Sequence, residues 1–86
     1  MRQATEIYTR EFDARFGLLP RPLQTRIEAH IRDLGRRLER FPHQRLRGRS
    51  EYRLRVGDYR VIYRFDVERN ELLLITLGHR REVYRV

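Results

Sequence analysis

The sequence predicts a compact single domain of the α+β class, in which two helices pack on one face of an antiparallel sheet. Three observations support this prediction: strand-like alternation around a turn at residues 52–65, a long amphipathic helical pattern at residues 22–41, and a length of 86 residues, which suits one domain over residues 1–86. The expected order is strand, helix, helix and then a three-stranded antiparallel meander.

The first half of the chain is expected to form one strand and two helices. Residues 4–9 are rich in β-branched and aromatic side chains, which favours a short strand. Residues 11–18 carry two Phe four positions apart, as on one face of a short helix, and a Gly and a Pro follow. Residues 22–41 repeat apolar side chains at helical spacing until Pro42 ends the pattern. We expect both apolar faces to pack on the sheet.

The turn Gly57-Asp58 fixes the register of the predicted hairpin. A Gly-first pair is typical of two-residue type II′ turns. This turn places Arg55 directly opposite Arg60, with Arg53 one step along the same face, while the apolar side chains share the other face. Facing like charges cost stability, so three guanidiniums on one face favour the binding of a polyanion.

The segments around the hairpin extend both its charge and the sheet. Residues 43–50 are interpreted as a basic loop that carries Arg45 and Arg47. Residues 66–70 are polar and predict a second turn, and the nearly continuous apolar run at residues 71–77 predicts a central strand buried on both faces.

Composition limits the function classes. The formal net charge is +8 and all 20 basic residues are Arg, so no Lys can act as a proton acceptor. This balance favours nucleic acid, an acidic protein or an anionic surface as partner. The chain has no Cys, which excludes disulfides and thiolate metal sites, and its three His are scattered, so no metal site is predicted. No apolar run is long enough to span a membrane. We therefore expect a soluble, cytoplasmic protein without a cofactor.

The segment after the last predicted strand carries groups suited to a chemical step. RNA is cut without a metal when its 2′-hydroxyl attacks the adjacent phosphate, which requires a base, an acid and positive charge at the transition state. His79 is the candidate base because imidazole exchanges protons near neutral pH, and Tyr84 suits an acid or a stacking platform. Taken singly, His79 is equally a polar residue at a strand end and Tyr84 a partly buried aromatic.

Three segments carry a resemblance to a known family: LRG at residues 46–48, YRLRVGDYRVIYRF at residues 52–65 and GHRREVY at residues 78–84. In this order, behind two helices, they resemble the RelE family of the RelE/ParE toxin superfamily of toxin–antitoxin systems. The resemblance implies a microbial-ribonuclease-like fold and a toxin that, like RelE, cuts mRNA in the ribosomal A site by 2′-hydroxyl attack without a metal. It also implies an acidic antitoxin as partner.

The resemblance assigns catalytic roles to Arg60, Arg80 and Tyr84 and RNA contact to the strand residues Arg53 and Arg55. The chemistry of the residues themselves adds His79 to the predicted catalytic residues, and the basic loop and the C-terminal segment add Arg45, Arg47 and Arg81 to the predicted RNA-binding residues. In the best-known member the strand positions that fall on Arg53 and Arg55 are lysines, one of them implicated as a base. Because both are Arg here, the base role passes to His79, and other members do use a C-terminal His.

Three alternatives stay open. The first is a ParE-like inhibitor of DNA gyrase, although ParE-type chains tend not to keep the ending with its arginine and tyrosine. The second is an inactive member that only binds RNA or its partner, which the absence of a lysine base keeps open. The third concerns the hairpin alone: its arginines are a solvated polar face, with Glu51 opposite Arg64 diluting the charge.

Overall fold

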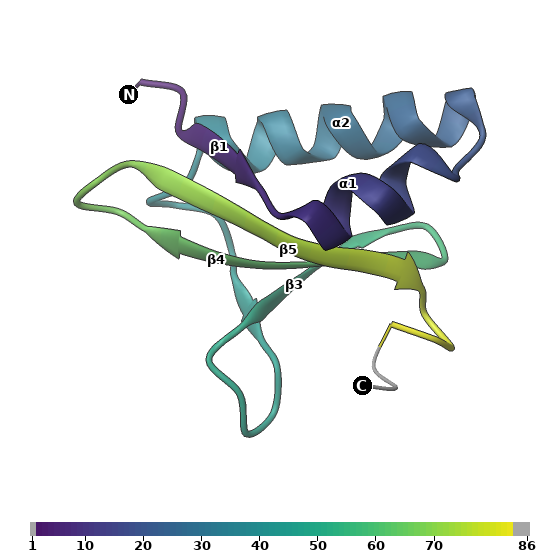
Figure 1. Ribbon diagram of the computed structural model, residues 1–86. Helices are drawn as coiled ribbons and strands as arrows, with labels where there is room; N and C mark the ends of the chain where they lie inside the picture. The colour runs from purple at the N-terminus through teal and green to yellow at the C-terminus, as the bar shows by residue number, and fades with distance from the viewer. Residues whose placement is uncertain (1, 84–86) are drawn as a thin grey trace.

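Two helices lie together on one face of a five-stranded sheet in the computed structural model, which describes residues 2–83 (Figure 1). The elements are β1 (Thr5–Tyr8), α1 (Arg10–Gly17), α2 (Arg21–Arg36), β2 (Gln44–Arg45), β3 (Tyr52–Val56), β4 (Tyr59–Asp66) and β5 (Glu71–His79). The predicted α+β class and the meander β3-β4-β5 are confirmed. We call the face of the sheet opposite the helices the helix-free face.

The strand order is β1-β5-β4-β3-β2, with β1 parallel to β5 and the other neighbours antiparallel. The predicted central place of β5 is confirmed, and the strand continues to His79, two residues beyond its predicted end. The prediction that β5 is buried on both faces is wrong. Leu72 and Leu74 are fully buried towards the helices, whereas Leu73 and Ile75 are only partly buried.

Thr9 is the N-cap of α1, and its side chain also bonds to β5. Its Oγ1 accepts a hydrogen bond from the Phe12 N–H at 3.0 Å, which caps the helix, and donates one to the Ile75 carbonyl at 2.6 Å. A single side chain therefore sets both where the helix starts and where it sits on the sheet.

The second helix ends at Arg36, not at residue 41 as its apolar spacing predicts. Arg37 leaves helical geometry, with φ −119° and ψ 30°, and the N–H groups of Arg40 and Phe41 bond to its carbonyl in tight turns. These turns keep Leu38 buried, so the apolar spacing of the sequence fits them as well as it fits a helix. Over so few residues, tight turns and an α-helix produce the same spacing of apolar residues.

The predicted basic loop at residues 43–50 contains the short strand β2, which the sequence prediction missed. Gln44 pairs with Arg53, and Arg45 pairs with Tyr52. Both residues of β2 are polar and exposed, so no apolar alternation marks them as a strand.

The main core lies between the sheet and the two helices. Its largest fully buried side chains are Tyr63, Phe12, Ile27, Ile31, Leu34, Leu38, Leu72, Leu74 and Leu77. Burial of each such side chain contributes on the order of 1.5–3 kcal/mol before entropy is counted. A separate small cluster on the helix-free face joins Leu46, Ile62 and Val83.

His43 links the end of the helical layer to the core. Its Nε2 lies 2.7 Å from the Leu38 carbonyl, which can only accept, so Nε2 carries the proton. Its Nδ1 then accepts from the Tyr63 hydroxyl at 2.6 Å, and its ring stacks on Phe65 with centroids 3.8 Å apart. Burial lowers the pKa of His43 from its ordinary value of 6.5, because this site favours the neutral ring.

The free energy of unfolding should therefore fall as the pH drops below about 6.5. The unfolded chain then binds a proton at His43 while the folded chain still resists it, so this contribution is complete above that pH and is lost below it. Denaturant titrations at pH 7.5 and 5.5 measure the loss, which His43→Phe should reduce and exposed His30→Gln should not. An equal loss in wild type and His43→Phe would contradict this account.

Candidate functional site

The predicted hairpin register is confirmed. Gly57 has φ 59° and Asp58 does not have a positive φ, as a type II′ turn requires. Arg55 is directly opposite Arg60, and Arg53 is opposite Ile62. Strand alternation therefore places all three arginines on the helix-free face.

Arg60 carries a charge that is nearly buried, with 7% of the residue exposed. Its Nη1 donates to the carbonyls of Gly57 and Tyr59, both at 2.9 Å. Within residues 2–83 no carboxylate forms an ion pair with it. Carbonyls satisfy donors without neutralising charge, so this guanidinium retains its capacity for an anion.

Arg80 approaches the same turn from the end of β5. Its backbone N–H donates to the Asp58 carbonyl at 2.7 Å, and its Nε lies 3.8 Å from Asp58 Oδ1. Both side chains are more than half exposed, so their attraction is weak and an incoming anion can compete with it. The structure therefore brings Arg55, Arg60 and Arg80 to one end of the sheet.

His79 lies at the same end of the sheet, but its side chain points to the face opposite that of Arg60. It pairs with Tyr59, and their rings meet edge to face with centroids 5.7 Å apart, while Gly78 pairs with Arg60. Alternation thus puts the imidazole on the helix side of the strand. The Arg81 N–H lies 3.2 Å from His79 Nδ1, an arrangement in which Nδ1 accepts and the neutral ring carries its proton on Nε2.

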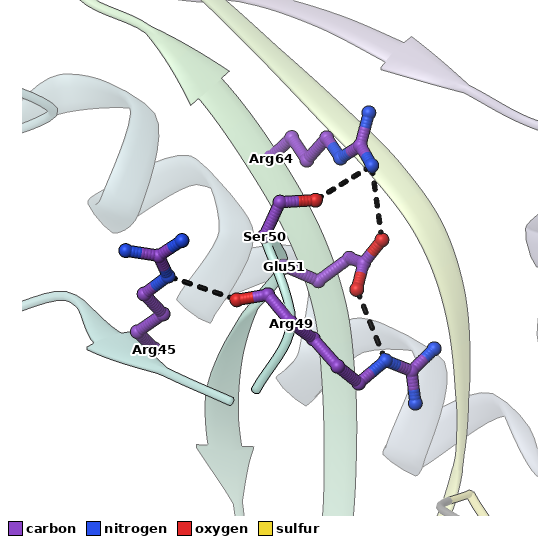
Figure 2. Close-up of polar contacts among 5 residues, drawn as sticks. All are labelled: Arg45, Arg49, Ser50, Glu51 and Arg64. Atoms are coloured by element: carbon purple, nitrogen blue, oxygen red, sulfur yellow. Dashed lines mark hydrogen bonds and ion pairs between the residues drawn. The ribbon is translucent and has the colours of Figure 1, made fainter. Parts of the chain in front are cut away.

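The loop after β2 is held by a polar network, shown in Figure 2. Glu51 accepts from Arg49 and Arg64, each at 3.1 Å, and Arg64 also donates to the Ser50 hydroxyl at 2.7 Å. Arg45 Nε donates to the Arg49 carbonyl at 2.8 Å. Although partial burial opposes the shift, the hydrogen bond from Arg64 and the charge of Arg49 hold the pKa of Glu51 below its usual range. Glu51 therefore neutralises part of the positive surface.

The predicted RNA-binding arginines are among the arginines that have no carboxylate partner in the described part of the chain. Among residues 2–83, none of them forms an ion pair; they are Arg45, Arg47, Arg53, Arg55 and Arg81. All are exposed except Arg53, which is partly buried and whose Nε donates to Gln44 Oε1 at 3.2 Å. Predicted Tyr84 lies outside the described residues.

Two arginines that the sequence analysis did not select also reach this end of the sheet. The Arg26 Nη1 from α2 lies 3.2 Å from where a Cβ on Gly57 would be. The Arg15 Nη1 from α1 lies 3.4 Å from the Leu77 carbonyl. In the sequence, Arg15 and Arg26 look like any other charged residue on the exposed face of a helix, so no local pattern marks them as part of the site.

The described residues hold no group of three His, Cys, Asp or Glu side chains that could bind a metal ion. Within residues 2–83, no helix has the length and apolar character needed to cross a membrane.

The chain was compared with protein families, curated proteins and solved structures. Residues 6–84 match the family described as ParE toxin of type II toxin-antitoxin system, parDE. A search of curated proteins gave no match. The chain is similar to a chain of the RelBE2 complex of Mycobacterium tuberculosis, with TM-score 0.80, 25% identity and coverage of 95% of this chain and 97% of that one.

Two further structures share the fold at lower identity. One is the archaeal RelE-RelB complex of Pyrococcus horikoshii, with TM-score 0.76, 23% identity and coverage of 95% and 100%. The other is the isolated RelE toxin of E. coli, with TM-score 0.74, 15% identity and coverage of 88% and 83%.

The geometry around Arg60 predicts that inorganic phosphate stabilises the fold. A ligand at tenfold its Kd adds about 1.4 kcal/mol to the free energy of unfolding. Arg60→Met should remove much of this gain while remaining at least as stable without phosphate, because an uncompensated buried charge disappears. Denaturant titrations with and without phosphate measure both effects. Arg69→Met, at the opposite turn, is the control, and an undiminished gain in Arg60→Met would contradict the assignment.

Proposed function

The chain belongs to the ParE toxin family of type II toxin-antitoxin systems, within the RelE/ParE superfamily, and we propose, from the likeness of its hairpin and C-terminal segment to RelE, that this toxin cuts mRNA in the ribosomal A site. The proposed reaction is attack of the RNA 2′-hydroxyl on the adjacent phosphate, with departure of the 5′-oxygen. In this reaction the substrate supplies its own nucleophile, so the protein needs only to position the strand, stabilise charge and assist proton transfer.

The observation that carries the proposal is the buried, unneutralised guanidinium of Arg60. A folded protein gains little from such a charge, and removal from water makes it costly. The cost is offset when an anion binds, and a phosphate with developing charge fits the planar donor fork of Arg better than a point charge does. Arg55, directly opposite, and Arg80, at the same turn, would share that phosphate.

The unpaired arginines around this centre suit the sugar–phosphate backbone of the message. Exposed guanidiniums bind phosphates with little regard to sequence, and they draw RNA to the surface from a distance. The same surface would attract an antitoxin. We propose that the antitoxin is acidic and covers part of the surface formed by Arg53, Arg55, Arg60 and Arg80, which would block RNA by occupying its phosphate contacts.

Inhibition of DNA gyrase by protein contact is the second candidate. The family match carries the ParE name. The orientation of His79 also favours it, because the imidazole lies on the face opposite Arg60 and no His among residues 2–83 faces the arginine cluster. Under this reading the arginines would bind an acidic protein surface rather than a phosphate.

Mapping of RNA 5′ ends after brief expression separates these functions. A nuclease leaves cuts at codon-phased positions in translated messages, whereas a gyrase inhibitor leaves messages intact and changes DNA supercoiling. Arg60→Ala and Arg80→Ala should each reduce cleavage roughly 100-fold to 1,000-fold, since each removes a donor to the transition state. Arg69→Ala should cut normally. Intact messages beside altered supercoiling would replace the proposal with the second candidate.

The roles of His79 and Tyr84 can be tested by rate measurements with purified ribosomes and message. If His79 transfers a proton, His79→Ala should slow cleavage roughly 100-fold to 10,000-fold. If Tyr84 stacks on a base, Tyr84→Phe should stay active and Tyr84→Ala should not. His30→Ala is the matched control. A His79→Ala variant that cuts at the wild-type rate would exclude the imidazole from the chemistry.

A further inference from the structure

A cavity of about 600 Å³ opens at the end of the sheet where α1 lies beside β5. It is lined by two aromatic residues, Tyr59 and His79, by two charged residues, Arg15 and Glu82, and by Leu18, Leu19, Leu77 and Gly78. Ligand pockets for small molecules have roughly this size, about 300–1,000 Å³, and this mixture of apolar surface with a few polar groups. None of the roles assigned above uses this cavity as a whole.

The aromatic and apolar part of the wall suits a flat ring. Tyr59 and His79 are cross-strand neighbours whose rings meet at 79°. Leu18, at the rim, is 85% exposed, the highest value among the exposed large apolar residues. A nucleobase that enters would stack on an aromatic ring and remove this leucine from water.

The polar part of the wall offers both a donor and an acceptor. Arg15 makes only long contacts, 3.4 Å to the Leu77 carbonyl and 3.7 Å to Glu11 Oε2, so its guanidinium can still donate to a ligand. The backbone N–H of Glu82 donates to the His79 carbonyl at 2.8 Å, which holds this residue beside the cavity. Within residues 2–83 the Glu82 carboxylate forms no ion pair.

We propose that this cavity is a nucleobase pocket that prefers guanine. Guanine offers N–H donors on one edge, which a carboxylate accepts, and the O6 and N7 acceptors on another edge, which Arg reads in bidentate fashion. Guanine alone combines neighbouring N–H donors for a carboxylate with the neighbouring O6 and N7 acceptors for Arg; adenine offers one amino group and N7, and cytosine and uracil lack N7. The pocket lies at the same end of the sheet as Arg60 but on the other face: Gly78, which pairs with Arg60, lines it, while Tyr59 and His79 point to the helix side. That the base belongs to bound RNA rests on the proposed function; the pocket itself does not.

NMR titration of the free toxin tests the proposal. The ligands are the four ribonucleoside 5′-monophosphates, with inorganic phosphate as the probe without a base. Guanosine monophosphate should bind at least about tenfold more tightly than phosphate, since stacking of one base contributes on the order of tenfold or more. It should also bind more tightly than the other three nucleotides and shift the ring signals of Tyr59 and His79.

Variants assign the effect to the pocket. Tyr59→Ala should remove the advantage of the nucleotide over phosphate, and Tyr59→Phe should keep it. Glu82→Gln should weaken the preference for guanine without unfolding risk at an exposed position, whereas Glu68→Gln, on an exposed turn elsewhere, should not. Thermal unfolding of each variant shows whether it is folded.

The proposal is overturned if the four nucleotides and phosphate bind equally, or if antitoxin but no nucleotide shifts the ring signals of Tyr59 and His79. The titrations with phosphate and with nucleotides distinguish failure of the pocket proposal from failure of the proposed function. Loss of phosphate binding at Arg60 with guanosine monophosphate still shifting His79 would leave the pocket standing and remove the phosphate centre. Phosphate binding at Arg60 with no response of either ring to any nucleotide would do the reverse.

Discussion

The two-residue turn between β3 and β4 is the constraint on which the candidate site depends. Its left-handed Gly57, with φ 59°, lets the chain reverse at once and so fixes Arg60 against the preceding strand. The carbonyl of Gly57 accepts from Arg60, and that of Asp58 accepts from the backbone of Arg80. Arg26 lies so close that a side chain at Gly57 would meet it. One turn thus sets the register and gathers the cations.

The two faces of the sheet differ in what they carry: one packs the main core, and the other holds the arginines of the candidate site. On the helix side, Val61 and Tyr63 are fully buried in the main core, which supplies most of the hydrophobic stabilisation. On the helix-free face, Ile62 belongs only to a small cluster, and Arg55 faces Arg60 at a cost to pairing. Because β4 serves both faces, a well-packed core can carry a row of charges that would destabilise a two-stranded hairpin alone.

The sequence could predict the features that depend on residues near one another in the chain, and it could not predict those that depend on residues brought together by the fold. The hairpin register was predictable because alternation and a two-residue turn are local signals, whereas β2 has only two polar residues and carries no pattern. The burial of Arg60 depends on turns that meet only in three dimensions, so no periodicity could reveal it. The orientation of His79 was within reach: the alternation that sets Arg55 against Arg60 also separates Gly78 from His79, but the predicted strand stopped at residue 77.

Under the proposed function, the separation of Arg60 from His79 limits the chemistry that this end of the sheet could assist. Its described groups on the helix-free face are guanidiniums, which hold charge but exchange no protons at working pH. Reactions that rely on such a surface gain most from positioning and from stabilisation of the phosphate charge, and these terms work only while a strand is held in place. Under the proposed function, a second partner that fixes the RNA would therefore suit this arrangement better than cleavage of free RNA by the toxin alone.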